Sequence, residues 1–143
     1  QGCHFRCKDC FNSETWDFSG GKPWTEDNKE KFLLLLSQDY IERVSILGGE
    51  PLADENFSDV LDLVQTIHEK FPEKKIWIYT GYYWDELLND SQKKRIFPYI
   101  NVLVDGRFET DKKDLSLKFK GSSNQRVIDV QGSLKNKEVV LFK

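Results

Sequence analysis

The chain has 143 residues, of which 38% are hydrophobic and 31% are charged, and its formal net charge is −3. This length and balance predict a single domain over residues 1–143 with a buried core. The slightly acidic charge argues against a nucleic-acid-binding protein, which usually has a basic face. Because no apolar run approaches the roughly 20 residues of a membrane-spanning helix, we expect a cytoplasmic protein that binds neither membranes nor nucleic acids.

Every cysteine of the chain lies in the segment GCHFRCKDC (residues 2–10), with the spacing C-x3-C-x2-C. An odd number of thiols this close together indicates a metal or redox site rather than a disulfide framework. A structural zinc site takes four ligands, and His4, the nearest candidate for the fourth, directly follows Cys3. An iron–sulfur cluster normally takes four cysteines, so three would leave one iron open to a ligand. Three unliganded thiols on one helix face are the remaining alternative.

After this loop, predicted helices and strands alternate along the chain. We expect helices from Thr25 to about Gln38, from Ser58 to the residue before Pro72, and over about 84–95. We expect strands over 43–47, 75–80 and 101–105, with shorter extended pieces at about 126–130 and 138–142. The repeat of strand, glycine turn and helix predicts an α/β fold with a parallel sheet, in which ligands bind beyond the carboxyl ends of the strands.

The turn GGEP (48–51) directly follows the first predicted strand. Gly48 and Gly49 allow the backbone to approach a ligand closely, and Pro51 stiffens the turn. The Glu50 carboxylate could accept a charge-assisted hydrogen bond from a ligand ammonium group. By itself the turn is equally compatible with an ordinary connection between a strand and a helix.

The cysteine motif combined with GGEP resembles the radical S-adenosylmethionine superfamily. Further segments resemble one family within it, the activating proteins of the anaerobic, class III ribonucleotide reductase. These segments are CFNSETW (10–16), IWIYTGYYWDEL (76–87), INVLVDGRF (100–108) and FKGSSNQRVIDVQ (119–131). The resemblance covers nearly the whole chain from Gly2 to about Gln131. The segments LVDGRF and GSSNQR make it specific to the family, since the cysteine motif alone identifies only the superfamily.

The resemblance implies a [4Fe–4S] cluster held by Cys3, Cys7 and Cys10, with S-adenosylmethionine bound to the fourth iron. The turn from Gly48 to Pro51 would hold the methionyl ammonium. An electron from a low-potential donor such as flavodoxin would reach the sulfonium through the cluster, and a 5′-deoxyadenosyl radical would form. By resemblance, that radical removes a hydrogen atom from a glycine Cα of the reductase large subunit, which is the expected partner.

Polar residues also end the next two predicted strands. Thr80 and Gly81 could line the adenosine or the methionine of the cofactor, with a plain strand end as the alternative. Asp105 could meet a ribose hydroxyl or orient the partner peptide, but an Asp-Gly pair also commonly forms a turn.

Two departures from the family pattern affect these expectations. Many superfamily members have an aromatic residue just before the third cysteine, close to the adenine, whereas this chain has Asp9. Family members also have a strand before the first cysteine that is absent here. We therefore expect a partial (βα) barrel-like parallel sheet of the radical S-adenosylmethionine type that lacks its N-terminal strand.

Two other functions remain open at this stage. The chain could activate another glycyl radical enzyme, such as pyruvate formate-lyase, although such activases share the cysteine loop and not the VLVDGRF and GSSNQR segments. It could instead be a non-catalytic zinc-binding interaction module. For GSSNQR (121–126) we expect a role in partner contact or in closing the sheet edge, and for Trp77 and Trp84 a role in packing.

Overall fold

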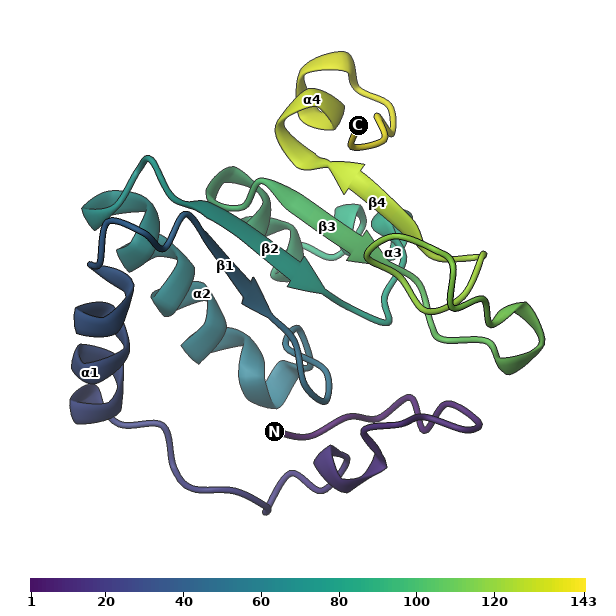
Figure 1. The fold of residues 1–143 in the computed structure, drawn as a ribbon, viewed down its shortest axis with the longest axis horizontal. Helices are drawn as coiled ribbons and strands as arrows, with labels where there is room; N and C mark the ends of the chain where they lie inside the picture. Colours follow the sequence, from purple (N-terminus) through teal and green to yellow (C-terminus); the bar gives the residue numbers. More distant parts are fainter.

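A four-stranded sheet organises the computed structural model, which describes residues 1–143 (Figure 1). Its strands are β1 (Arg43–Ile46), β2 (Lys75–Tyr79), β3 (Val102–Asp105) and β4 (Arg126–Asp129), in this spatial order. The first three strands are parallel, and their register pairs Val44 with Ile76 and Ile78 with Leu103. The three strand positions predicted from the sequence are therefore confirmed, as is their parallel arrangement.

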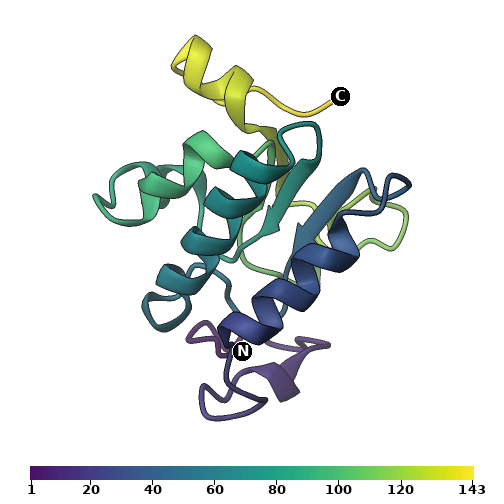
Figure 2. The same cartoon turned by 90° about the vertical axis from the view of Figure 1, so that its left-hand side faces the viewer.

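Helices connect the strands and cover one face of the sheet. They are α1 (Glu26–Leu36), α2 (Asp54–Lys70), α3 (Trp84–Leu88) and α4 (Val130–Asn136), with 3-10 helices η1 (Ser13–Thr15), η2 (Lys93–Tyr99) and η3 (Thr110–Lys112). Figures 1 and 2 show α1 and α2 on the same side of the sheet. None of these helices combines the length and the apolar composition that a membrane-spanning segment needs.

The main hydrophobic core lies between the sheet and these helices. Ile76 and Ile78 of β2 point into it, where they join buried residues of α2 such as Val64 and Ile67. Trp77 lies between the two isoleucines and points to the opposite face, where it packs in a smaller cluster with Val102 and Val104. This alternation is the period-two pattern of a strand that is buried on both faces. Trp84 joins the main core, so the predicted packing roles of both tryptophans are confirmed.

The predicted start of the second helix was wrong. Thr25 caps α1 as expected, since its side chain accepts a hydrogen bond from the N–H of Asn28. Helix α2, however, begins at Asp54, and Ser58 lies inside it. The carbonyl of Ala53 already accepts the N–H of Phe57 at 2.9 Å. Two acidic residues in the first turn favour this earlier start through the helix dipole.

The helix predicted over 84–95 is divided into two pieces, α3 and η2. Asp90 lies between them, and its Oδ1 accepts the N–H groups of Gln92 and Lys93 at 2.9 and 3.0 Å. An Asp side chain that bonds to backbone N–H groups in this way begins a new helical turn rather than continuing the old one.

The end of the chain also differs from the expectation, because β4 is antiparallel to β3. A parallel strand needs a crossover connection, usually an α-helix, and the only helix in residues 106–125 is the short η3. The piece expected at 138–142 forms only an isolated bridge between Leu141 and Ile128. Helix α4 was not predicted.

Asp105 and Arg126 join β3 to β4. The Asp105 carboxylate is fully buried, and its two oxygens accept hydrogen bonds from Nε and a terminal nitrogen of Arg126 at 3.1 and 2.6 Å. The N–H of Trp84 donates a further hydrogen bond at 2.9 Å. Asp105 is therefore satisfied within the protein and acts as a structural link between β3, β4 and α3.

Arg126→Met is expected to lower the free energy of unfolding by about 3 kcal/mol, because it leaves a buried carboxylate without its charged partner. Urea denaturation at neutral pH measures the change. Arg95→Met, which affects an exposed arginine bonded only to Gln92, should stay within about 0.5 kcal/mol of the parent. Equal stability of the two variants would show that the pair with Asp105 contributes little.

Candidate functional site

A pocket of about 460 Å³ opens at the carboxyl ends of β1, β2 and β3. The N-terminal loop that carries the cysteines runs beneath these strand ends (Figure 1). Most residues predicted from the sequence to form the site line this pocket: Cys3, Cys7, Cys10, Gly48, Gly49, Glu50, Thr80 and Gly81. Segments from three distant parts of the sequence thus meet where the topology of the sheet places a ligand site.

Short backbone hydrogen bonds fix the cysteine loop against the first strand turn. The N–H of Glu50 donates to the carbonyl of Gly2 at 2.7 Å, and the N–H of Gly2 donates to the carbonyl of Thr15 at 2.8 Å. A Cβ at Gly49 would lie 2.4 Å from the Gly2 oxygen. The close approach therefore requires glycine at position 49, which gives the second glycine of the turn a physical reason.

The cysteine loop is curled by two residues with left-handed backbone conformation. Arg6 has a φ of 52° and Asp9 a φ of 59°. Such values are uncommon outside glycine and cost free energy. They let the backbone turn twice within the motif, so all three cysteines face the same pocket.

The three thiols are partly buried and unbridged. Burial raises the pKa of Cys3, and the nearby charges of Glu50 and Cys10 raise it further. Burial likewise raises the pKa of Cys7, with Cys3 and Cys10 adding to the effect. Thiolates gathered in this way repel one another unless a cationic group binds between them. The donor set fits an iron–sulfur cluster, whose irons take thiolate ligands.

A single metal ion fits these residues less well. No group of three or more His, Cys, Asp or Glu side chains converges closely enough to hold one ion. His4, the possible fourth zinc ligand, bonds through Nε2 to Glu55 at 2.7 Å and lies 4.5 Å from the ring of Phe18. The imidazole therefore has a structural partner away from the thiols.

Glu50 is more deeply buried than the sequence indicated, with 3% of its surface exposed. Its Oε2 accepts hydrogen bonds from the hydroxyl of Thr80 and the N–H of Leu52, both at 2.8 Å, and its Oε1 accepts the N–H of Gly81 at 2.7 Å. Burial raises the pKa of this carboxyl, while the three hydrogen bonds oppose the rise. Because a carboxylate oxygen has two acceptor positions, Oε1 retains capacity for one more donor.

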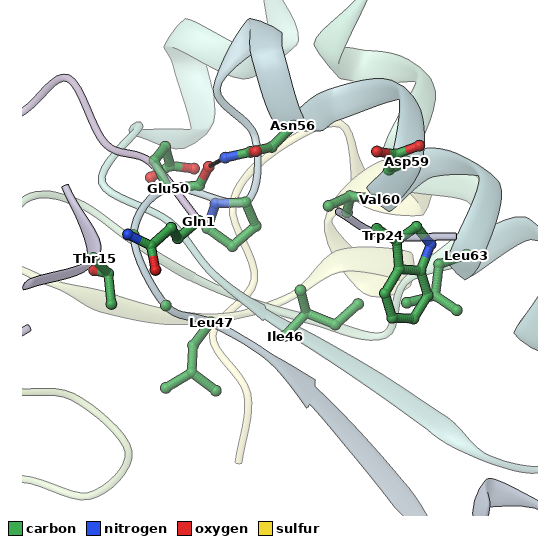
Figure 3. A pocket seen from close by; sticks show the side chains of 13 residues that line it. Gln1, Thr15, Trp24, Ile46, Leu47, Glu50, Asn56, Asp59, Val60 and Leu63 are labelled. Carbon is green, nitrogen blue, oxygen red and sulfur yellow. Dashed lines mark hydrogen bonds between the residues drawn. The ribbon is translucent and has the colours of Figure 1, made fainter. Parts of the chain in front are cut away.

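Pro51 and Asp105 do not line the pocket. Pro51 lines a neighbouring cavity of about 320 Å³ next to β1, together with Trp24 and Ile46 (Figure 3). Asn56 also lines this cavity and donates to the Glu50 carbonyl at 2.9 Å. Asp105 lies behind the pocket in the pair with Arg126, so the structure gives no opening for the predicted contact with a ribose or a peptide.

Arg107 is a pocket residue that the sequence reasoning missed. Its guanidinium lies 4.4 Å from the ring centroid of Phe5 and 3.2 Å from the Glu86 carboxylate. Its positive charge also opposes, to a small extent, the rise in the pKa of Cys7 that burial causes. The sequence offered one signal for this role, namely a basic residue two positions beyond the end of a predicted strand.

The GSSNQR segment braces the turn that carries Arg107. Asn124 donates to the Arg107 carbonyl at 2.7 Å, and Gln125 donates to the Gly106 carbonyl at 2.9 Å. Gln125 also accepts the N–H groups of Gly121 and Ser122. These bonds hold the end of β3 in place beside the pocket.

Known proteins match this chain over most of its length. The family model described as a 4Fe-4S single cluster domain matches residues 1–128. The anaerobic ribonucleoside-triphosphate reductase-activating protein of Salmonella typhimurium is 43% identical over 128 residues, which cover 88% of this chain and 82% of that protein. The protein of the same name from Escherichia coli is 42% identical over the same shares of both chains.

A more distant relative carries the same name. The activating protein of Enterobacteria phage T4 is 32% identical over 126 residues, or 88% of this chain and 78% of that one. No solved structure matched the chain. The resemblance carried by the cysteine motif and the LVDGRF and GSSNQR segments is thereby confirmed, and the chain belongs to the family of anaerobic ribonucleoside-triphosphate reductase-activating proteins.

Proposed function

We propose that this chain activates an anaerobic ribonucleoside-triphosphate reductase, with a [4Fe–4S] cluster and S-adenosylmethionine bound together in the pocket of about 460 Å³. The observation that carries the proposal is the meeting of three thiols and the Gly-Gly-Glu turn in one pocket at the carboxyl ends of parallel strands. The names of the relatives support the same partner.

Cys3, Cys7 and Cys10 would hold the cluster, each through its thiolate. When bound, the cluster and S-adenosylmethionine supply a one-electron cleavage of a C–S bond and the removal of a hydrogen atom from a glycine Cα of the reductase. The chain's own residues orient these groups and keep them apart from water. No side chain needs to act as a general acid or base.

Glu50 would hold the methionyl ammonium through the remaining acceptor position of Oε1. Because Thr80, Leu52 and Gly81 already fix the carboxylate, it binds the ammonium without first reorganising. Gly48 and Gly49 leave the pocket wall free of side chains next to it. Thr80 and Gly81 form the adjoining wall, whereas Pro51 stiffens the turn from the far side.

We further propose that the parallel strands belong to a partial barrel of the radical S-adenosylmethionine type, formed by one domain. A low-potential donor such as flavodoxin would supply the electron. The proposed location is the cytoplasm, where a reducing environment keeps three thiols available for a cluster.

Replacing Cys3, Cys7 or Cys10 by Ala is expected to prevent cluster assembly, because the remaining two thiols hold the cluster too weakly. After anaerobic reconstitution the parent should contain about four irons and four sulfides per chain, and its EPR signal should change with S-adenosylmethionine. Iron and sulfide analysis measures the loss, with Lys8→Ala in the same loop as the control. Stoichiometric zinc without iron in anaerobically purified parent protein would contradict the cluster and favour the zinc-binding module.

Glu50→Gln is expected to weaken S-adenosylmethionine binding by about 1.5–3 kcal/mol, the value of a hydrogen bond to a charged group. This corresponds to a roughly 10- to 150-fold higher Kd, measured by anaerobic calorimetry on cluster-loaded protein. Urea denaturation of the same variant reports its structural role, and Glu69→Gln on the exposed side of α2 is the matched control. A less stable variant with the parent's affinity would show that Glu50 only joins the strands.

A further inference from the structure

Residues 112–123 form a hairpin beside the pocket, between β3 and β4. Lys113 and Ser122 form an antiparallel bridge at its base, and the N–H of Asp114 donates to the Gly121 carbonyl at 3.2 Å. At its tip, Asp114 Oδ1 accepts the N–H and the hydroxyl of Ser116 at 2.9 and 2.6 Å. Turns closed by such a side chain hold a defined shape.

The returning half of the hairpin is anchored on the sheet. Phe119 has a φ of 65°, a conformation that costs a bulky residue free energy and persists only where packing enforces it. Its ring meets Trp77 edge-on with the centroids 4.9 Å apart, and the Arg43 guanidinium lies 5.6 Å from its centroid. The hairpin is therefore a fixed feature of the surface rather than a loose connection.

This fixed hairpin presents an apolar side chain to solvent. Leu115 at its tip is 89% exposed, the highest value among the large hydrophobic residues of the chain. Lys113 and Lys118 flank it, both exposed and neither in an ion pair. A single exposed leucine needs no explanation in itself. This one stands on an anchored turn between two lysines that form no ion pair, an arrangement suited to an apolar socket with acidic edges.

The hairpin also forms part of the wall of the proposed cofactor pocket. Phe119, Lys120 and Gly121 line the pocket that contains the cysteines. The adjoining residue Thr110 donates through its hydroxyl to the carbonyl of Lys8 in the cysteine loop at 2.9 Å. A protein that places a backbone segment in this pocket therefore comes close to the hairpin.

We propose that the hairpin 112–123 is a docking element for the reductase, with Leu115 inserted into an apolar socket of the partner and Lys113 and Lys118 facing carboxylates at the edge of that socket. The proposal rests on the proposed function, since it takes the partner to be the protein whose glycine enters the pocket. It adds a contact outside the pocket that fixes which protein is recognised. The pocket itself then needs to fit only a glycine-containing backbone.

Binding of the cofactor-free chain to the reductase of the same organism tests the docking element without requiring catalysis. Leu115→Ser is expected to raise the Kd about tenfold or more, as for an interface anchor. Leu34→Ser, a leucine on α1 that is 69% exposed and distant from the hairpin, is the matched control and should bind like the parent. The double variant Lys113→Glu/Lys118→Glu should slow association and remove most of its salt dependence, with Lys31→Glu on α1 as its control.

Three results separate this proposal from its competitors. Parent-like binding by both hairpin variants would overturn the docking element. So would normal reductase binding combined with slower reduction of the cluster by flavodoxin, because the hairpin would then serve the electron donor. If the parent binds the reductase and Leu115→Ser does not, but the loaded parent releases no 5′-deoxyadenosine, the docking element stands and the proposed function fails.

Discussion

The site depends on one buried carboxylate, that of Glu50. Its side chain accepts hydrogen bonds from Leu52, Thr80 and Gly81, while its own N–H donates to the Gly2 carbonyl. One residue thus connects the end of β1, the end of β2 and the cysteine loop. An unpaired buried charge would cost several kcal/mol, and the three donors offset much of this cost. Where they hold the carboxylate, they also hold together the pocket walls.

The same arrangement explains how a structural residue can also serve a ligand. A carboxylate fixed by protein donors has lost its rotational freedom during folding, so a ligand ammonium does not have to restrict it again. Burial strengthens the attraction because little water competes for the charge. Burial also raises the pKa of Glu50 and so disfavours its charged form. A bound cation would reduce this rise.

The sequence predicted the parts of the fold that depend on local patterns. Glycines follow the three parallel strands within two residues of their ends, at Gly48, Gly81 and Gly106, and the apolar runs of the strands are visible without any structure. The direction of β4 could not be predicted in this way. It depends on whether the segment before β4 contains a helix that can cross back over the sheet. Asp105 illustrates the same limit for the site. An aspartate at a strand end looks like a ligand residue until its partner Arg126 is known, and that partner lies 21 positions further along the chain.

The antiparallel return of β4 also explains why the site has a lateral wall. A connection between two adjacent antiparallel strands starts and finishes at the same end of the sheet, along the strand direction. Residues 106–125 therefore stay near the carboxyl ends of the parallel strands, on the side of the cysteine loop. They contribute Arg107, Phe119 and Lys120 to the pocket. If β4 were parallel, this segment would have to cross to the amino ends of the strands, and that side of the pocket would be open. The buried pair of Asp105 and Arg126 lies at the point where the segment leaves and rejoins the sheet. The residue first expected to bind a ligand therefore links the two strands between which the wall of the ligand site is formed.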